Sequence, residues 1–277
     1  MIPDYLVWPG LALLGVGVGI YGTIIGAGGG FLLVPILIFL YPDLPPESIT
    51  ALSLGVVFFN ALSGTQAYAR QKRIDYEAGL IFTTTTVPSA VIGALATGLF
   101  AAEAFELAFG IFLAVAAIWL LVPRPTSMRV TPPAPRMRRH SITDIDNFIY
   151  VFWFDPWLAL FMGLVIGVGA SLFGVGGGIF LVPAMVLLMR VPSHIATATS
   201  TFVLLFTGGT GAFVHLVTGH YAGLAVEELS LATGSLVGAQ VGAILSRRLV
   251  NRQELVARFF SVALLLVSFR MVAVALF

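Results

Sequence analysis

The sequence of 277 residues contains no cysteine and little charge, since Asp, Glu, Lys and Arg together make up 10% of it. Soluble domains carry about 25% charged residues. The absence of cysteine excludes disulfide frameworks, thiolate metal sites and cysteine nucleophiles. The scarcity of charge, with 58% hydrophobic residues and a mean hydropathy of +1.01, excludes a water-soluble fold, because so much apolar surface cannot be hidden from water. We therefore predict an all-α integral membrane protein.

Uncharged stretches recur along nearly the whole chain, and most approach the roughly 20 residues that a helix needs to cross the hydrocarbon core. Only the segment 123–155, rich in proline and arginine at its start, lacks this character. We predict that it is an extended linker that can end in a short surface helix. Ten helical elements are expected, at 5–26, 30–41, 49–69, 78–101, 104–122, 156–174, 178–190, 195–218, 222–245 and 255–277.

The two halves of the chain repeat each other. The run GAGGGFLLVP at 26–35 recurs as GVGGGIFLVP at 174–183, at an offset of 148 residues. A weaker match follows, between TALS at 50–53 and TATS at 197–200. Internal duplication is a recurrent plan of secondary transporters. We therefore divide the chain into a first transmembrane repeat at 1–122, the linker at 123–155 and a second transmembrane repeat at 156–277.

Lysine and arginine gather at alternate boundaries between the elements. They follow the third, fifth, seventh and ninth elements, for example at Arg73, Arg190 and Arg252, whereas the other connections contain none. By the positive-inside rule, the linker is cytoplasmic and both termini lie outside, with the protein in the cell (inner) membrane. Five elements per half then give the second repeat the opposite orientation, so we predict two inverted five-element repeats.

Each glycine run lies in a stretch that is too short for two full crossings. No charge interrupts residues 5–42 or 156–189, which are 38 and 34 residues long, whereas two spans and a turn need more than about 40. We predict that the first helix of each repeat breaks at the glycines and continues as a short second helix of about 12 residues. The charge pattern does not distinguish this arrangement from two thin spans.

A helix that begins directly after each glycine run turns its unpaired amides and positive dipole end toward the break. Such donors bind anions without a buried cation. We expect the two breaks to meet near the midplane and to line the substrate site, while close helix packing is the alternative explanation for the glycines. The predicted substrate-binding residues are Thr23, Gly26, Gly28, Gly29, Gly30, Phe31, Ser53, Asn60, Ser171, Gly174, Gly176, Gly177, Gly178, Ile179, Ser200 and Thr207.

Few titratable residues lie within the apolar elements. His215 is the candidate for proton coupling, because imidazole titrates near neutral pH, and a packing histidine is the alternative. Glu227 and Glu228 are expected to cap the ninth element at the outer surface, and Arg270 to reach the outer headgroups. The acidic residues otherwise avoid helix centres. We therefore expect no carboxylate relay, no metal site and no catalytic residues.

The duplicated Gly-x-Gly-Gly-Gly-x-x-x-x-Pro pattern resembles the signature of the TauE/SafE family of membrane transporters, also called sulfite exporters. The resemblance covers both repeats and nearly the whole chain outside the linker. It implies the export or exchange of sulfite, a sulfonate or another sulfur-containing anion.

We predict a secondary transporter that moves a small anion by alternating access and needs no cofactor. Its partners are the solute and the lipid bilayer, with no nucleic acid. An anion channel lined by the same donors is the alternative, and an intramembrane enzyme or a receptor is a weaker one. The sequence leaves open whether a proton or another ion is coupled, and whether the chain forms a homo-oligomer.

Overall fold

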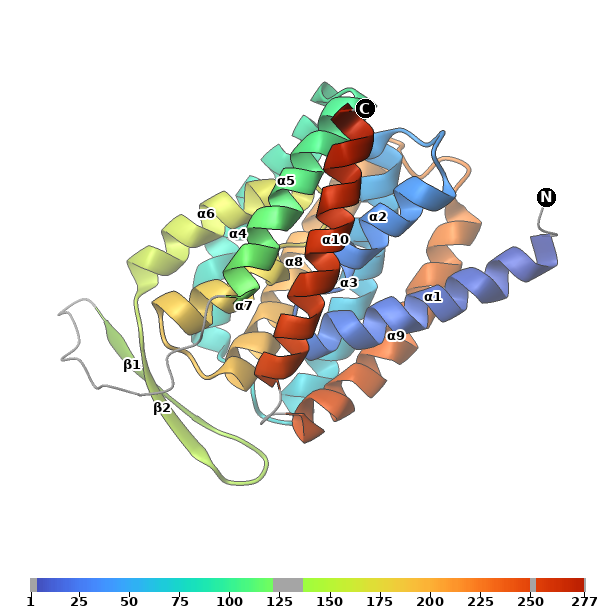
Figure 1. Cartoon of the computed structure of the whole chain (residues 1–277). Helices are drawn as coiled ribbons and strands as arrows, with labels where there is room; N and C mark the ends of the chain where they lie inside the picture. The colour runs from blue at the N-terminus through green and yellow to red at the C-terminus, as the bar shows by residue number, and fades with distance from the viewer. Residues whose placement is uncertain (1–3, 122–136, 250–252, 277) are drawn as a thin grey trace.

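The structure is a computed structural model that describes residues 4–121, 137–249 and 253–276 (Figure 1). The first half contains α1 (Asp4–Ile25), α2 (Gly30–Leu40), α3 (Pro46–Arg70), α4 (Tyr76–Ala96), the 3-10 turn η1 (Thr97–Leu99) and α5 (Ala102–Leu121). The second half contains α6 (Pro156–Leu172), α7 (Gly178–Pro183), the π-helical turn η2 (Ala184–Leu188), α8 (Ser193–Val217), α9 (Ala225–Arg248) and α10 (Gln253–Leu276). Each predicted apolar element thus coincides with a helix.

Six of the described helices are long and apolar enough to cross a membrane, namely α1, α3, α4, α5, α8 and α9. Large apolar side chains also cover the outside of the bundle, with Leu13 and Phe269 about three-quarters exposed. A surface of this kind is unfavourable in water and suits hydrocarbon. The prediction of an all-α membrane protein is confirmed.

The two halves are interleaved. α1 packs on α9, α4 packs on α6, and α3 packs on α8, so each of these pairs joins a helix of one half to a helix of the other. Glycines allow the close approach, since Gly234 and Gly238 of α9 lie against main-chain atoms of α1 and leave no room for a Cβ. α3 and α8 form the centre, and α5 pairs with α10 at the periphery (Figure 1).

The linker ends in a β-hairpin, so the expected surface helix is wrong. β1 (Arg138–Thr143) pairs antiparallel with β2 (Ile149–Phe154). The sequence IYVFWF of β2 consists of aromatic and β-branched residues, which favour strands. The turn is held by Asp144, whose carboxylate accepts from the N–H groups of Asp146 and Phe148, and Asn147 adopts a φ of 64°. The proline-rich start of the linker lies outside the described residues.

The hairpin is attached to the α3–α4 connection. The imidazole of His140 forms a buried hydrogen bond with the carboxylate of Asp75, which also caps α4 by accepting from the N–H of Ala78. The N–H of Ile145 donates to the carbonyl oxygen of Gln71 at 3.2 Å. The hairpin therefore lies at the end of the bundle where α3 ends and α4 begins (Figure 1).

We expect the attachment of the hairpin to weaken as the pH rises. The hydrogen bond to Asp75 raises the pKa of His140, although burial opposes this. The charged pair therefore contributes fully below the ordinary histidine value of about 6.5 and is lost as the pH rises through the raised pKa. Amide hydrogen exchange in 138–154, corrected for intrinsic rates, should show less protection at high pH. His140→Ala should abolish this pH dependence and the exposed Arg139→Ala should keep it; equal behaviour of the two variants would contradict the assignment.

Candidate functional site

Both helices that carry a glycine run are broken where the sequence predicts. α1 ends at Ile25 and α2 begins at Gly30, while α6 ends at Leu172 and α7 begins at Gly178. Side chains with a Cβ are strained at positive φ, so the backbone of the breaks requires glycine. Six glycines of the two breaks have such angles: Gly26 (79°), Gly28 (73°), Gly29 (87°), Gly174 (70°), Gly176 (77°) and Gly177 (96°).

The two breaks form the same main-chain hydrogen bonds. In the first, the N–H groups of Ala27 and Gly28 donate to the carbonyl oxygen of Gly22 at 2.8 and 3.2 Å. In the second, Val175 and Gly176 donate to Ala170 at the same two distances. The next amide N–H groups along the chain lie at the start of α2 and α7. Those of Gly29, Gly30, Gly177 and Gly178 donate no main-chain hydrogen bond to any described residue.

The two breaks lie directly against each other. Gly30 packs on the carbonyl oxygen of Gly174, and Gly178 packs on that of Gly26, with no space for a Cβ at either glycine. These contacts are related by the repeat, since Gly26 corresponds to Gly174 and Gly30 to Gly178. Segments 148 residues apart in the sequence thus meet in the interior.

We call this contact between the two breaks the crossing. Two serines of the central helices α3 and α8 donate hydrogen bonds to it. Ser53 of α3 donates to the carbonyl oxygen of Gly174 at 2.6 Å, and Ser200 of α8 donates to that of Gly26 at 2.8 Å. Both serines are fully buried. Each therefore fixes the break of the opposite half, and these predicted residues are brought together.

Apolar side chains of the central helices also pack on the breaks. Val57 of α3 and Leu204 of α8 both pack on Gly28 and on Gly176. The predicted residues Phe31 and Ile179 are fully buried in the hydrophobic core.

A second pair of predicted positions differs between the halves. In the first half, the hydroxyl of Thr23 donates to the amide oxygen of Asn60 at 3.1 Å, and the amide nitrogen of Asn60 donates to Gly19 at 3.0 Å. In the second half Thr207 replaces Asn60, and its hydroxyl donates to its own helix at 3.1 Å. Ser171, the counterpart of Thr23, is consequently fully buried with no hydrogen-bond partner in the described part of the chain.

His215 is buried near the carboxyl end of α8. Its Nδ1 lies 3.1 Å from Nδ1 of His220, and its Nε2 lies 3.4 Å from the hydroxyl of Thr50. Gly174 packs on the main chain of Thr50. Thr50 therefore lies between His215 and the second break. The role of His215 in proton coupling stays a prediction.

Glu228 is not a surface cap, so that expectation is wrong. Both oxygens of its carboxylate are buried without a partner among the described residues, and the carboxylate lies against Gly55 of α3. It lines a cavity of about 500 Å³ between α3, α8 and α9. Helical spacing could have revealed this, because Glu228 precedes the buried Leu231, Ser235 and Gly238 on one face of α9.

A second buried charge lies beneath the hairpin. Arg73 follows α3, and the Nε and Nη1 atoms of its guanidinium are buried with no described partner. Burial lowers the pKa of Arg73, while Tyr68, Asp144 and Tyr150 nearby act in the opposite direction. His194, at the start of α8, contacts the ring of Tyr150 at a centroid distance of 4.4 Å.

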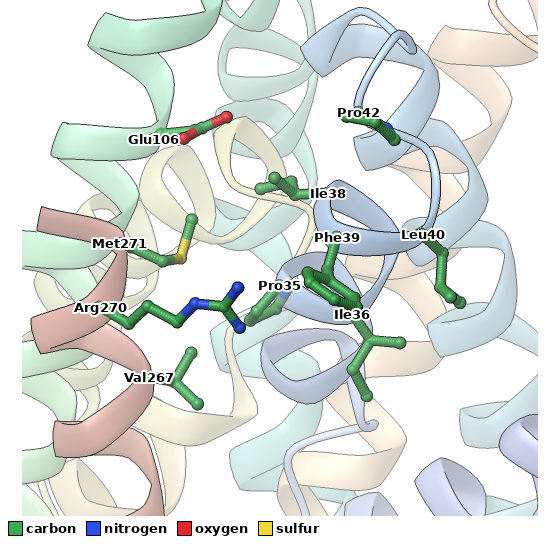
Figure 2. Close-up of a pocket in the computed structure, with 10 residues that line it drawn as sticks. All are labelled: Pro35, Ile36, Ile38, Phe39, Leu40, Pro42, Glu106, Val267, Arg270 and Met271. Atoms are coloured by element: carbon green, nitrogen blue, oxygen red, sulfur yellow. The ribbon is translucent and has the colours of Figure 1, made fainter. Parts of the chain in front are cut away.

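A peripheral cavity of about 590 Å³ lies between α2, α5 and α10 (Figure 2). Arg270 reaches across it from α10, with its guanidinium carbon 4.9 Å from the ring centroid of Phe39, and Glu106 faces it from α5. The remaining lining is apolar and includes none of the predicted site residues.

A helical membrane bundle in which two interrupted helices meet in the interior is an architecture of secondary transporters. Comparison with known families agrees with this class, because residues 11–271 match the family described as Sulfite exporter TauE/SafE. The chain therefore belongs to the TauE/SafE family and is a multi-pass membrane transporter.

Curated relatives carry the same general description. The probable membrane transporter protein YunE of Bacillus subtilis is 33% identical over 248 residues, which cover 87% of this chain and 89% of that protein. A probable membrane transporter protein of Methanocaldococcus jannaschii is 29% identical over 216 residues, covering 76% and 73% of the two chains. One from Xylella fastidiosa is 24% identical, covering 91% and 89%. No solved structure matches the chain.

The crossing of the breaks predicts a strong position dependence for glycine substitutions. A methyl group at Gly30 or Gly178 would overlap a carbonyl oxygen of the opposite break. Because main chain cannot move aside as a flexible side chain can, Gly30→Ala and Gly178→Ala should each lower the free energy of unfolding by about 1–3 kcal/mol or more. Thermal unfolding in detergent measures this.

Gly17→Ala is the matched control, since Gly17 is an exposed glycine of α1 with no atom within 4 Å of an added Cβ. It should leave the midpoint unchanged or raise it slightly, because alanine favours helix. Equal midpoints for Gly17→Ala and Gly30→Ala would show that the two breaks are not in contact.

Proposed function

We propose that this chain is a secondary transporter that carries a small anion by alternating access, with sulfite, a sulfonate or another sulfur-containing anion as its substrate. The observation that carries the proposal is the contact between the two breaks. Both leave main-chain amides without main-chain partners at the start of a helix, and the two sets of amides lie around one crossing. The family description points to sulfite as the first solute to test.

The depth of the amides follows from helix length. α2 has 11 residues, which at about 1.5 Å per residue span roughly 16 Å, about half of the hydrocarbon core of about 30 Å. A helix of this length with one end near the membrane surface has its other end near the midplane. The positive dipole ends of α2 and α7 then favour an anion in a region where an ammonium or guanidinium group would be costly.

Ser171 supplies a side-chain donor to the same site. Its hydroxyl is buried beside the second break and has no partner in the described residues. A buried donor without a partner costs free energy, and an anion would satisfy it. In the first half, the hydroxyl of Thr23 already donates to Asn60 and is not free to bind an anion. The proposed anion therefore lies nearer the second break.

The orientation we propose has the linker in the cytoplasm and both termini outside, with the two halves as inverted repeats in the cell inner membrane. The pairing of α1 with α9 and of α4 with α6 supports the inverted arrangement, because corresponding contacts recur with the halves exchanged. The basic ends of α3 and α9 support the cytoplasmic placement, since Arg73 lies beneath the hairpin and Arg247 forms an ion pair with Asp146 of its turn. Arg73 is then positioned to attract anions toward the cytoplasmic end of the central helices.

The proposal is tested by flux into liposomes that contain the purified protein. Uptake of labelled sulfite, thiosulfate or a short sulfonate should saturate, and preloaded unlabelled anion should accelerate it by counterflow. An open channel would give flux without counterflow. Absence of flux for every anion would contradict anion transport by this chain.

Replacement of Ser171 separates binding from stability. Ser171→Ala removes a hydroxyl that has no partner among the described residues, so the unfolding midpoint should stay the same or rise. If the hydroxyl binds the anion, the half-saturating concentration should rise by about five- to tenfold, as expected for a lost hydrogen bond of about 1–1.5 kcal/mol.

The control is Thr84→Val, because Thr84 faces outward on α4 and donates only to its own helix at 2.7 Å. It should leave the half-saturating concentration unchanged. If Ser171→Ala behaves like this control, Ser171 is not part of the anion site.

A further inference from the structure

The carboxylate of Glu228 lies inside the bundle without the partners that a charged group requires. Both of its oxygens are buried and unpartnered among the described residues. Holding an unpaired carboxylate in apolar surroundings costs several kcal/mol or more, and protonation removes the charge. A residue with this cost inside a membrane helix is by default a functional candidate.

The surroundings of the carboxylate offer almost nothing polar. α3 contributes Gly55, Phe58 and Phe59 to the cavity, and α8 contributes glycine, alanine, phenylalanine and leucine. Among the described residues, Tyr221 is the only other titratable residue that lines it, and its hydroxyl donates to the carbonyl oxygen of Ala51 at 2.6 Å. Burial raises the pKa of Tyr221, and the charge of Glu228 raises it further. Tyr221 therefore stays protonated and donates to the main chain.

The other titratable residues near Glu228 interact with other groups. The neighbouring Glu227 also has one carboxylate oxygen, Oε2, that is buried without a hydrogen-bond partner among the described residues, but it does not line the cavity and it interacts with Tyr41, in the connection that follows α2. His215 and His220 contact each other at the end of α8, and the main-chain oxygen of His220 accepts from Ser48. Neither histidine forms a hydrogen bond with Glu228 in the described part of the chain, so the carboxylate of Glu228 is an isolated proton acceptor beside a cavity.

The repeat shows that this cavity is particular to one half. Gly55 corresponds to Phe202, by the same offset that relates Ser53 to Ser200. The ring of Phe202 packs on Gly79 of α4. Glycine at position 55 instead leaves room for the carboxylate.

The cavity and the glycine breaks share one stretch of α3. Gly55 and Phe58 line the cavity on one face of the helix, while Val57 between them packs on Gly28 and Gly176. A change in charge at Glu228 therefore acts on the helix segment that supports the crossing. This connection links the acid to the proposed anion site.

We propose that Glu228 is a proton-binding site that couples anion movement to proton movement in this transporter. The inference rests on the proposed function. Uptake of one proton converts the carboxylate to a neutral acid, and release restores the charge, so one proton moves for each cycle. The ligand is a proton, because a metal cation needs several oxygen ligands and no group of three His, Asp or Glu residues in the described ranges could hold one.

The first experiment measures sulfite accumulation in liposomes with an imposed pH difference. With one proton per monoanion, a difference of one pH unit should change the steady-state accumulation of the wild type about tenfold, because a pH unit is equivalent to 1.36 kcal/mol. Glu228→Gln, which mimics the neutral acid, should lose this response. Glu227→Gln is the matched control and should keep it. A sodium gradient should have no effect on either protein.

The second experiment does not depend on flux. The infrared difference spectrum of the purified protein between low and high pH should contain the band of a protonated carboxyl group in an apolar environment. This band should persist in Glu227→Gln and be absent in Glu228→Gln. If no anion is transported but the band behaves in this way, the anion proposal fails and the proton site stands.

Three results would overturn the inference. The first is an identical infrared difference spectrum in the wild type and in Glu228→Gln. The second is wild-type accumulation that follows a sodium gradient, or that ignores the pH difference altogether. The third is a Glu228→Gln variant that still responds fully to the pH difference, which would assign coupling to another group, with His215 as the next residue to replace.

Discussion

The contact between the two broken helices is the constraint on which the rest of the structure depends. Main chain that leaves a helix inside a membrane must find partners within the protein. Here the carbonyl oxygens of Gly26 and Gly174 are satisfied by Ser200 and Ser53, each from the opposite half. Neither half can complete this centre alone, so the halves must interleave, and the pairing of α1 with α9 and of α4 with α6 follows.

The proposed anion and proton sites both lie where the two halves differ. With Thr207 in the place of Asn60, the hydroxyl of Ser171 has no partner in the ranges that the structure describes. Replacement of Phe202 by Gly55 opens a cavity for the carboxylate of Glu228. The glycines and serines of the crossing are the same in both halves because each break needs positive φ angles and a hydrogen-bond donor for a main-chain carbonyl oxygen. The unmatched positions carry polar groups without partners, and these are the groups that a ligand can satisfy.

The sequence predicted the parts of this fold that depend on local rules. Uncharged stretches located the ten helices, and positive φ angles occur at the duplicated glycines because no other residue accepts them without strain. The hairpin was missed because the proline-rich start of 123–155 dominated the interpretation, although IYVFWF favours a strand. Glu228 was missed because acidic residues near a helix start are usually caps. The sequence pairs Thr207 with Asn60, but only the structure shows that the hydroxyl of Thr207 donates to its own helix and that Ser171 has no partner among the described residues.

Coupling between a proton and an anion requires an element that both ligands bias, because a ligand shifts a conformational equilibrium only by its differential affinity for the two states. α3 meets this requirement. Its residues around Val57 separate the cavity of Glu228 from the glycine crossing, and Ser53, one turn earlier, holds the second break. A charge at Glu228 favours a state in which water enters the cavity, whereas a neutral acid tolerates the closed state. Because close-packed glycine contacts do not deform gradually, movement of α3 between these states would loosen or tighten the crossing as a unit.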